Sequence, residues 1–395
     1  MLEDEGLTVL GFSRLDERRA QDAVAAIEGG FRPGRPGGRK LLAAFRDWLV
    51  ETIPDQIADL EPVIEEWQPD VLVCDLSMWA PQVVLWEKLG VQVALSSTFM
   101  GPLIPGPDAP AWGLGMPAPR TSAQRAAARG ITRVTELLGM PLRKRVDALR
   151  AEHGLPPMGC SVNRFTARLP LYLVGSVPEL DYDRRDLPPS VHYVGASHWH
   201  PVPDESTETF LRTVPPGRPW VHVTESTVHT SDPFILRAAA SGLGDAPVEA
   251  ILTTGGHRDP ASLGLGIPAR NIHVARWLSH PELLRRCSVV VTAGGQATIL
   301  SALAAGVPLV VVPTTWDKPD NAQRVVAAGA GIRLAPKRCK PEALLTAVLD
   351  VLGDLSYAAA AKRLAARLHE APGAVRAAEL LEGLVPTLAA VGGAR

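Results

Sequence analysis

Short apolar runs alternate with longer segments of helical periodicity along most of this chain. The runs are rich in valine, leucine and isoleucine, which is typical of strands in a parallel sheet covered on both faces. They lie at residues 71–75, 91–96, 171–174, 192–195, 221–224, 250–254, 271–275, 289–291 and 309–312. Helices are predicted at residues 41–66, 79–89, 122–152, 341–371 and 375–391. This pattern predicts an α/β fold with parallel sheets.

Two further segments stand outside this alternation. Residues 7–10 read Leu-Thr-Val-Leu, and we expect a strand there. Residues 99–120 are rich in proline and glycine. An irregular segment of this length is either a binding loop or a loop that covers the core, and the pattern favours neither interpretation.

The stretch 287–334 carries the clearest candidate chemistry. Gly294 and Gly295 follow a valine strand, and a helix is predicted from Gln296 to Ala305 with Thr298 in its first turn. Small residues let an anion approach the backbone, and a helix N-terminus presents free N–H groups and the positive end of its dipole. The stretch therefore predicts an anion-binding site.

A polar loop follows one crossover later. Gly306 and Pro308 end the helix, a strand follows, and Asp317, Asp320 and Asn321 stand after its carboxyl end. Ligands of open α/β sheets bind at this edge. A phosphate site beside such a loop predicts a phosphorylated polyol, for example a nucleotide sugar. The alternative is an ordinary βαβ unit without a ligand, because a Gly-Gly pair alone is weak evidence.

Composition narrows the class of protein. The chain has 395 residues, 46% of them hydrophobic and 21% charged, which indicates a globular protein of two domains. A net charge of −2 gives no general attraction to nucleic acid or to an anionic membrane. We see no signal peptide and no apolar run long enough to span a bilayer, so we expect a cytoplasmic protein without stable membrane insertion.

The four cysteines lie far apart and have no metal-ligand spacing. We therefore expect no metal site. Cys74 and Cys287 lie in apolar strand contexts and are predicted to be buried thiols in a reducing compartment.

The run after residue 291 resembles the donor-binding signature of the GT-B glycosyltransferases that attach nucleotide-activated sugars to small natural products, including antibiotics. That signature reads roughly Thr-His-Gly-Gly-x-x-Thr, Gly-Val-Pro, Pro, Asp-Gln and Asn-Ala. The matching positions here are Thr292, Gly294, Gly295, Thr298, Gly306, Val307, Pro308, Pro313, Asp317, Asn321 and Ala322.

Two positions depart from the family pattern. The resemblance places Ala293 where the family has a diphosphate-binding His, and Lys318 where it has a sugar-binding Gln. Lys318 either replaces part of the lost positive charge near the phosphates or is a solvated surface lysine, and both interpretations stay open.

The resemblance extends to other loops of the same half. Residues 223–227 resemble Val-x-x-Gly-Thr, which assigns a phosphate contact to Thr227, and Trp277 with His280 resembles Trp-x-Pro-Gln, which assigns them to the nucleobase. Glu225 would repel a diphosphate if it faced one, and the alternative is that it points into the gap between the domains. For Trp277 the alternative is an ordinary core residue.

The first half carries the expected acceptor side. Residues 67–75 resemble the family's Pro-Asp-x-x-x-x-Asp strand, in which the last Asp orients a catalytic His, and Asp75 takes that position. Asp75 is either a carboxylate base or the N-cap of the helix at 79–89. No His precedes His153, so the family's first strand and helix, with its Gly-His base, has no counterpart; either the chain begins at a downstream start or it is a genuine variant.

Taken together, the resemblance implies two Rossmann-like domains facing each other across a cleft. We expect an acceptor domain (1–205), a linker (206–217), a donor domain (218–375) and a C-terminal helix (376–395). For this helix, packing against the first domain is one alternative. The implied activity is transfer of a sugar from a nucleoside diphosphate to a small hydrophobic acceptor, with inversion and with no cofactor beyond the donor. The alternatives are a weak or inactive nucleotide-sugar-binding protein and a GT-B epimerase.

Overall fold

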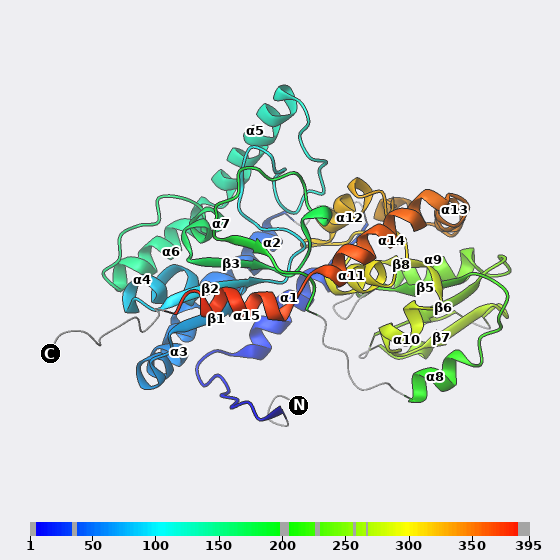
Figure 1. Cartoon of the computed structure of the whole chain (residues 1–395), viewed down its shortest axis with the longest axis horizontal. Coiled ribbons are helices and arrows are strands. Elements are labelled where there is room, and N and C mark those ends of the chain that lie inside the picture. Colours follow the sequence, from blue (N-terminus) through cyan, green and yellow to red (C-terminus); the bar gives the residue numbers. More distant parts are fainter. Residues whose placement is uncertain are drawn as a thin grey trace.

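The chain forms two α/β domains that lie side by side in a computed structural model (Figure 1). The structure describes residues 5–33, 38–197, 205–225, 230–255, 258–265 and 268–385. Each domain is built on a parallel sheet with helices on its faces, as the buried apolar runs predict.

The first domain has a four-stranded sheet of order β1-β2-β3-β4. Its strands are β1 (Val71–Asp75), β2 (Gln92–Ser97), β3 (Leu171–Val174) and β4 (Val191–Tyr193). Its helices are α1 (Glu17–Gly29), α2 (Gly38–Phe45) with a π-helical turn (Arg46–Val50), α3 (Ile53–Trp67), a π-helical turn (Pro81–Leu85) continued by α4 (Trp86–Leu89), α5 (Ser122–Leu138), α6 (Met140–Glu152) and α7 (Val162–Phe165).

The second domain has a six-stranded sheet of order β10-β9-β8-β5-β6-β7. Its strands are β5 (Trp220–Thr224), β6 (Glu249–Thr253), β7 (Ile272–Ala275), β8 (Cys287–Thr292), β9 (Leu309–Val311) and β10 (Gly331–Arg333). Its helices are α8 (Glu205–Leu211), α9 (Phe234–Gly242), α10 (His280–Leu284), α11 (Gln296–Ala304), α12 (Lys318–Ala327), α13 (Pro341–Gly353) and α14 (Leu355–Glu370). The strand order reverses between β5 and β8, and such a switch point opens a ligand crevice at the carboxyl edge.

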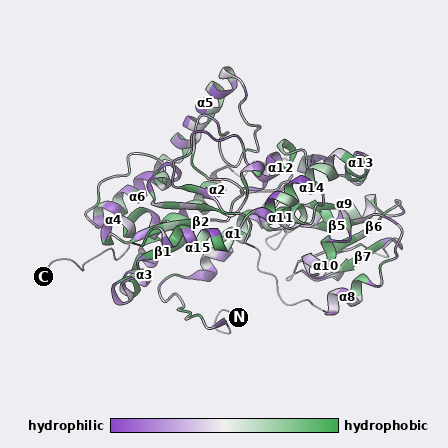
Figure 2. Cartoon of the chain, viewed as in Figure 1, coloured by the Kyte–Doolittle hydropathy of each residue, from purple (hydrophilic) through white to green (hydrophobic). Residues whose placement is uncertain are grey.

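The strands of the second domain form its core. Val289, Val290 and Val291 of β8 are completely buried, and the two faces of the sheet belong to two separate hydrophobic clusters. Figure 2 shows the apolar character of these central strands. The predicted burial of the run at 289–291 is confirmed.

The predicted strand at residues 7–10 is wrong. This segment has no regular structure, and Leu7 and Leu10 are 56% and 55% exposed. A strand needs a neighbour that takes its backbone hydrogen bonds. Just beyond it, the Asp59 carboxylate of α3 accepts the backbone N–H groups of Ser13, Arg14 and Leu15, which directs the chain along α3 and leaves β1 as an edge strand.

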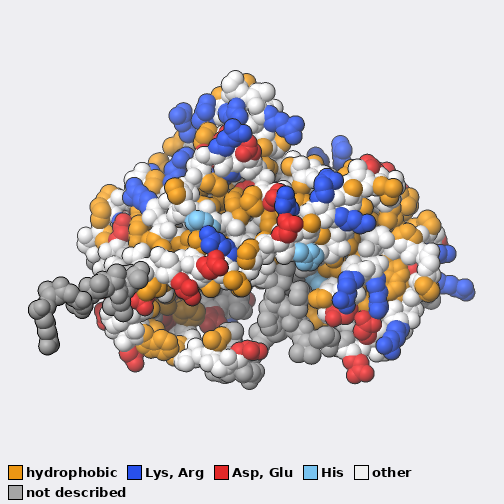
Figure 3. All heavy atoms as spheres, in the orientation of Figure 1, with side chains coloured by type: hydrophobic (Ala, Val, Ile, Leu, Met, Phe, Trp, Pro, Cys, Tyr) orange, Lys and Arg blue, Asp and Glu red, His pale blue; other side chains and the backbone are white. Residues whose placement is uncertain are grey.

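Helix α5 projects from the first domain, and basic side chains gather there on the face shown in Figure 3. Arg129 and Arg133 are exposed, as the charged pattern of residues 122–152 predicts. Leu137 and Leu138 are also exposed, by 61% and 60%, so the outer surface of α5 is mixed rather than uniformly polar.

Contacts from α12 and its neighbours join the two domains. The Asp320 carboxylate accepts the backbone N–H groups of Gly113 and Gly115 at 2.6 and 2.7 Å. Arg324 Nε lies 2.8 Å from Asp181 Oδ1. These bonds hold α12 of the second domain against two loops of the first domain.

The last helix, α15 (Ala374–Glu382), returns to the first domain (Figure 1). Leu380, Leu381 and Leu384 pack against a cluster that includes Leu171 and Leu173 of β3. The carboxyl-terminal segment therefore contributes to the core of the first domain. Among the described helices, none is by itself long and apolar enough to cross a bilayer; by length and composition only α13 and α14 together would be, and they bend by 71° at their junction.

Candidate functional site

The glycine loop after β8 has a geometry that only glycine fits. Gly294 has φ +98°, and a Cβ there would lie 3.0 Å from Val311 Cγ1 and 3.2 Å from the Lys318 carbonyl oxygen. Gly295 is the N-cap residue of α11, and no side chain caps the helix there. The first turn of α11, which includes the buried Thr298, therefore presents N–H groups that an anion can bind.

The loop after β9 is bonded directly to the glycine loop. Asn321 Nδ2 donates to the Gly294 carbonyl at 3.0 Å and to Asp317 Oδ2 at 2.7 Å. Burial raises the pKa of Asp317 to about 6, while the Asn321 hydrogen bond and the Lys318 charge oppose the shift. The structure thus brings together Gly294, Asp317, Lys318 and Asn321, which the sequence assigned to one site.

Lys318 is not a solvated surface lysine, so that interpretation is wrong. Its Nζ lies 2.6 Å from Glu28 Oε1 and 3.1 Å from Thr314 Oγ1, and both charged residues are buried. A buried ammonium group needs a counterion, and Glu28 of α1 supplies it. Nothing in the sequence indicated this partner, because the two residues are 290 positions apart.

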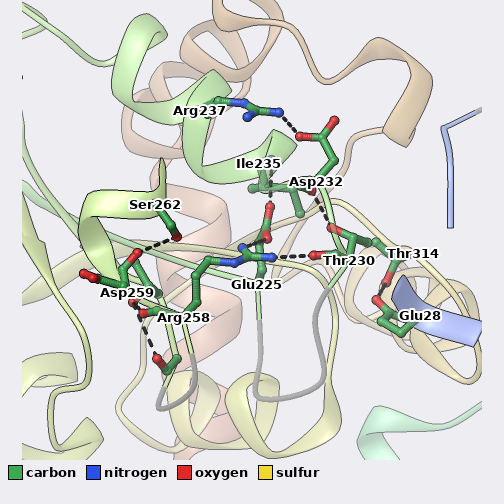
Figure 4. Close-up of polar contacts among 12 residues, drawn as sticks. Glu28, Glu225, Thr230, Asp232, Ile235, Arg237, Arg258, Asp259, Ser262 and Thr314 are labelled. Carbon is green, nitrogen blue, oxygen red and sulfur yellow. Dashed lines mark hydrogen bonds and ion pairs between the residues drawn. The ribbon is translucent and has the colours of Figure 1, made fainter. Parts of the chain in front are cut away.

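Glu225 does not point into the interdomain gap. Its Oε1 accepts the backbone N–H of Ile235 at 2.9 Å, and its Oε2 lies 2.7 Å from Arg258 Nη1 (Figure 4). Burial raises the pKa of Glu225, and the Arg258 bond opposes this shift. The carboxylate therefore binds the first turn of α9 and is neutralised there. Thr227, the expected phosphate contact, lies outside the described residues.

The two residues expected at the nucleobase behave differently. Trp277 follows β7 at the carboxyl edge and is 49% exposed, so the core interpretation is wrong. The His280 ring packs against the His222 ring, with ring centroids 5.7 Å apart. It lines a small hollow with Ser301 and Ala304, at the end of α11 remote from Gly294. The structure does not bring His280 to the glycine loop.

A cavity of about 590 Å³ lies in the first domain and reaches α12. Its walls are rich in aromatic rings. Phe99 stacks on Trp112 with ring centroids 5.8 Å apart. The Trp316 ring centroid lies 5.0 Å from that of Phe45 and 5.4 Å from that of Trp48. The aromatic lining fits a hydrophobic ligand.

Trp316 connects this cavity to the loop after β9. It directly precedes Asp317, has φ +60°, and its buried Nε1 has no hydrogen-bond partner among the described residues. A left-handed conformation is rare for a tryptophan and is characteristic of functional sites. The indole N–H is therefore available to a ligand.

The proline-rich segment 99–120 contributes to the cavity wall and also contacts α12. Phe99, Pro102, Leu103, Ile104 and Trp112 line the cavity, while other residues of the same loop bond to Asp320. A role of this loop in ligand binding therefore stays a prediction.

Asp75 lies at the carboxyl end of β1 and lines the cavity. Its Oδ1 accepts both the backbone N–H and the hydroxyl of Ser77, at 2.9 and 2.6 Å. The N-cap interpretation is therefore wrong, because the carboxylate bonds to the turn before the helix rather than to the helix. Among the described residues, Asp75 Oδ2 has no protein donor, and no histidine lines the cavity.

Glu136 of α5 is a further acidic residue at the cavity wall, besides Asp75 and Asp320. Its Oε1 lies 2.6 Å from Arg164 Nε, which leaves it neutralised. Sequence reasoning did not single it out, since an acidic residue on a charged helix carries no distinctive pattern.

Comparisons with known proteins identify relatives of this chain. Residues 243–384 match the family model "Erythromycin biosynthesis protein CIII-like, C-terminal domain". The chain is 34% identical over 354 residues to a 4'-demethylrebeccamycin synthase of Lentzea aerocolonigenes, covering 89% of this chain and 82% of that protein. A PGL/p-HBAD biosynthesis rhamnosyltransferase of Mycobacterium bovis (strain BCG / Pasteur 1173P2) is 33% identical over 217 residues, covering 55% of this chain and 46% of the relative.

Solved structures show the same architecture. The glycotransferase of kitacinnamycin superposes with a TM-score of 0.67 at 22% identity, covering 90% of this chain and 86% of that one. The calicheamicin glycosyltransferase CalG4 has a TM-score of 0.62 at 18% identity, covering 98% and 85%. At these identities the likeness concerns the fold, and the predicted pair of facing Rossmann-like domains is confirmed.

Proposed function

Because this chain belongs to the GT-B glycosyltransferases of antibiotic and other natural-product biosynthesis, we propose that it moves a sugar from a nucleoside diphosphate at the glycine loop to a hydrophobic acceptor in the aromatic cavity. One observation carries this proposal: the segment 314–321 contacts the glycine loop and also lines the aromatic cavity. Asn321 bonds to Gly294, while Trp316 and Asp320 line the cavity. A sugar bound at this loop would lie beside the acceptor.

The donor is held by the carboxyl edge of the second sheet. The first turn of α11, with Gly294, Gly295 and Thr298, binds the pyrophosphate, and Trp277 stacks on the base. Asp317 and Asn321 bind the sugar, Lys318 places its positive charge beside the phosphates, and Thr227 adds a phosphate contact. A structural neighbour, the spinosyn rhamnosyltransferase SpnG, forms a complex with thymidine diphosphate, which supports a donor of this class. No other cofactor is used, since α11 and Lys318 supply the positive charge.

The chemical step is a direct displacement with inversion. The acceptor oxygen forms a bond to the anomeric carbon, and the bond to the diphosphate oxygen breaks with its electron pair. Asp75 takes the acceptor proton, directly or through water, while Ser77 orients the carboxylate. The helix N-terminus stabilises the charge that develops on the leaving diphosphate.

Calorimetry with UDP and dTDP tests the donor site. Gly294→Ala should weaken nucleotide binding by about tenfold or more, because its Cβ would press on Val311 and the Lys318 backbone. Gly353→Ala is the control, since its Cβ would meet open space. Equal affinity in wild type and Gly294→Ala would contradict the proposal.

A turnover assay with a panel of nucleotide sugars and aromatic acceptors completes the test. Transfer to an acceptor with inverted anomeric configuration is expected. Interconversion of the donor sugar without any acceptor would instead indicate an epimerase.

A further inference from the structure

The end of α1 is inserted against the loop that we assign to the donor sugar. Glu28 is completely buried, and its Oε1 lies 2.6 Å from Lys318 Nζ and 2.5 Å from Thr314 Oγ1. Its Oε2 accepts a hydrogen bond from the Thr315 hydroxyl. Figure 4 shows Glu28 on its blue helix pointing at Thr314. A carboxylate of the first domain thus accepts hydrogen bonds from three side chains of the second domain.

The same end of α1 also contacts the connection between β5 and α9. Ser231 Oγ donates to the Gly29 carbonyl at 2.9 Å, and the rings of Phe31 and Phe234 lie 6.3 Å apart. In the sheet, β8 lies between β5 and β9. A segment that touches the loops after β5 and β9 therefore passes over the end of β8, where the glycine loop begins.

The docked helix end carries negative charge to this place. A helix C-terminus has the negative end of the dipole, and the Glu28 carboxylate adds to it. A nucleoside diphosphate sugar is also an anion, and it would need the same hydrogen-bonding side chains. Lys318, whose backbone oxygen lies 3.2 Å from the Cβ position of Gly294, cannot serve both ligands in one geometry.

We propose that α1 is a built-in competitor of the nucleotide sugar. Without donor, Glu28 occupies Lys318, Thr314 and Thr315; when donor binds, the end of α1 leaves this edge of the sheet. The inference rests on the proposed donor site. Its consequence is that the apparent affinity for donor is reduced by the fraction of molecules in which α1 is docked.

Removing the carboxylate should therefore tighten nucleotide binding. We expect Glu28→Gln to lower the Kd for UDP or dTDP, whichever the enzyme prefers, by about tenfold in calorimetry with the full chain. Asp22→Asn is the matched control: it removes the same charge from an exposed position of α1 and should leave the Kd unchanged.

The opposite results are informative. Unchanged or weaker binding by a folded Glu28→Gln protein would overturn the inference, because Glu28 would then be a bystander or a part of the donor site. Absence of nucleotide binding in wild type and in every variant would overturn the proposed donor site as well, so the two failures are distinguishable.

A disulfide lock tests the movement without removing Glu28. A Cβ at Gly29 would lie 3.2 Å from Ser231 Oγ, which suits a disulfide between Gly29→Cys and Ser231→Cys. The oxidised double variant should bind nucleotide at least about tenfold more weakly than the same protein after reduction. Equal affinity in the oxidised and reduced forms would show that donor binding does not require α1 to leave.

Discussion

The two sheets of this enzyme differ in how completely they are enclosed. Every residue of β5, β6 and β9 is buried, whereas β1 is an edge strand whose Val73 is 48% exposed. In the second domain, the glycine loop and its partner Asn321 are only 27 positions apart. The start of the first domain is organised by distant partners: Glu28 bonds to Lys318 and Ser13 to Asp59. Local sequence patterns therefore describe the second domain well. They describe the start of the first domain poorly, because it depends on contacts between residues far apart in the sequence.

The acceptor side, though less regular, should carry the chemical step. Asp75→Asn should lower kcat by about 100-fold or more, because an amide cannot accept the acceptor proton. Glu136→Gln, at the same cavity wall, is the control and should retain most activity, since Glu136 is already neutralised by Arg164. Steady-state kinetics with saturating donor would separate the two, and equal losses would remove Asp75 from its assigned role.

The difference between the sheets should appear directly in stability. Val290→Ala, at a fully buried position of β8, should lower the free energy of unfolding by about 2 kcal/mol through lost burial and a cavity. The same change at Val73 should cost less than about 0.5 kcal/mol, because that side chain is half exposed. Urea unfolding of the two variants provides the comparison, and similar losses would contradict it.

The buried carboxyl of the donor side should give a pH signature. The folded pKa of Asp317 is raised to about 6, so its contribution to stability is present at low pH and is lost as the pH rises through that value. Asp317→Asn stays neutral, and relative to wild type it should gain about 2 kcal/mol of unfolding free energy between pH 4 and pH 7.5. Unfolding curves that run parallel for the two proteins at all pH values would contradict the assignment.

The half-buried carboxylate of Asp59, in the first domain, should show the opposite trend and a smaller effect. Burial raises the pKa of Asp59, but the hydrogen bonds from Ser13, Leu15 and Arg14 outweigh it, and the folded pKa is lowered. Its contribution is present at neutral pH and is lost as the pH falls through the folded pKa. Asp59→Asn should accordingly speed proteolysis near residue 13 at pH 7, and its difference from wild type should shrink as the pH falls through the folded pKa.

Much of the second domain could be predicted from sequence because its signals are local. The run at 289–291, the two glycines and Pro308 specify a strand, a turn and a helix end without reference to the rest of the chain. The position of Asn321 between Gly294 and Asp317 follows from the same spacing.

The rest could not be predicted because it depends on partners that no spacing encodes. The apolar run at 7–10 has the composition of a strand, but composition does not supply a neighbouring strand. Lys318 and Glu225 each have a buried counter-charge, Glu28 and Arg258, from an unrelated segment. Only the folded chain reveals that these charges are neutralised.

The contacts of α12 have a consequence for building hybrid enzymes. Asp320 accepts backbone N–H groups of the acceptor loop, Arg333 donates to the Gly115 carbonyl, and Arg324 pairs with Asp181. A chimera cut only at the connection between the domains would unite an α12 with a loop that did not evolve beside it. Exchange of sugar specificity between relatives should therefore succeed most often when residues 113–116 and Asp181 are transplanted together with the donor half.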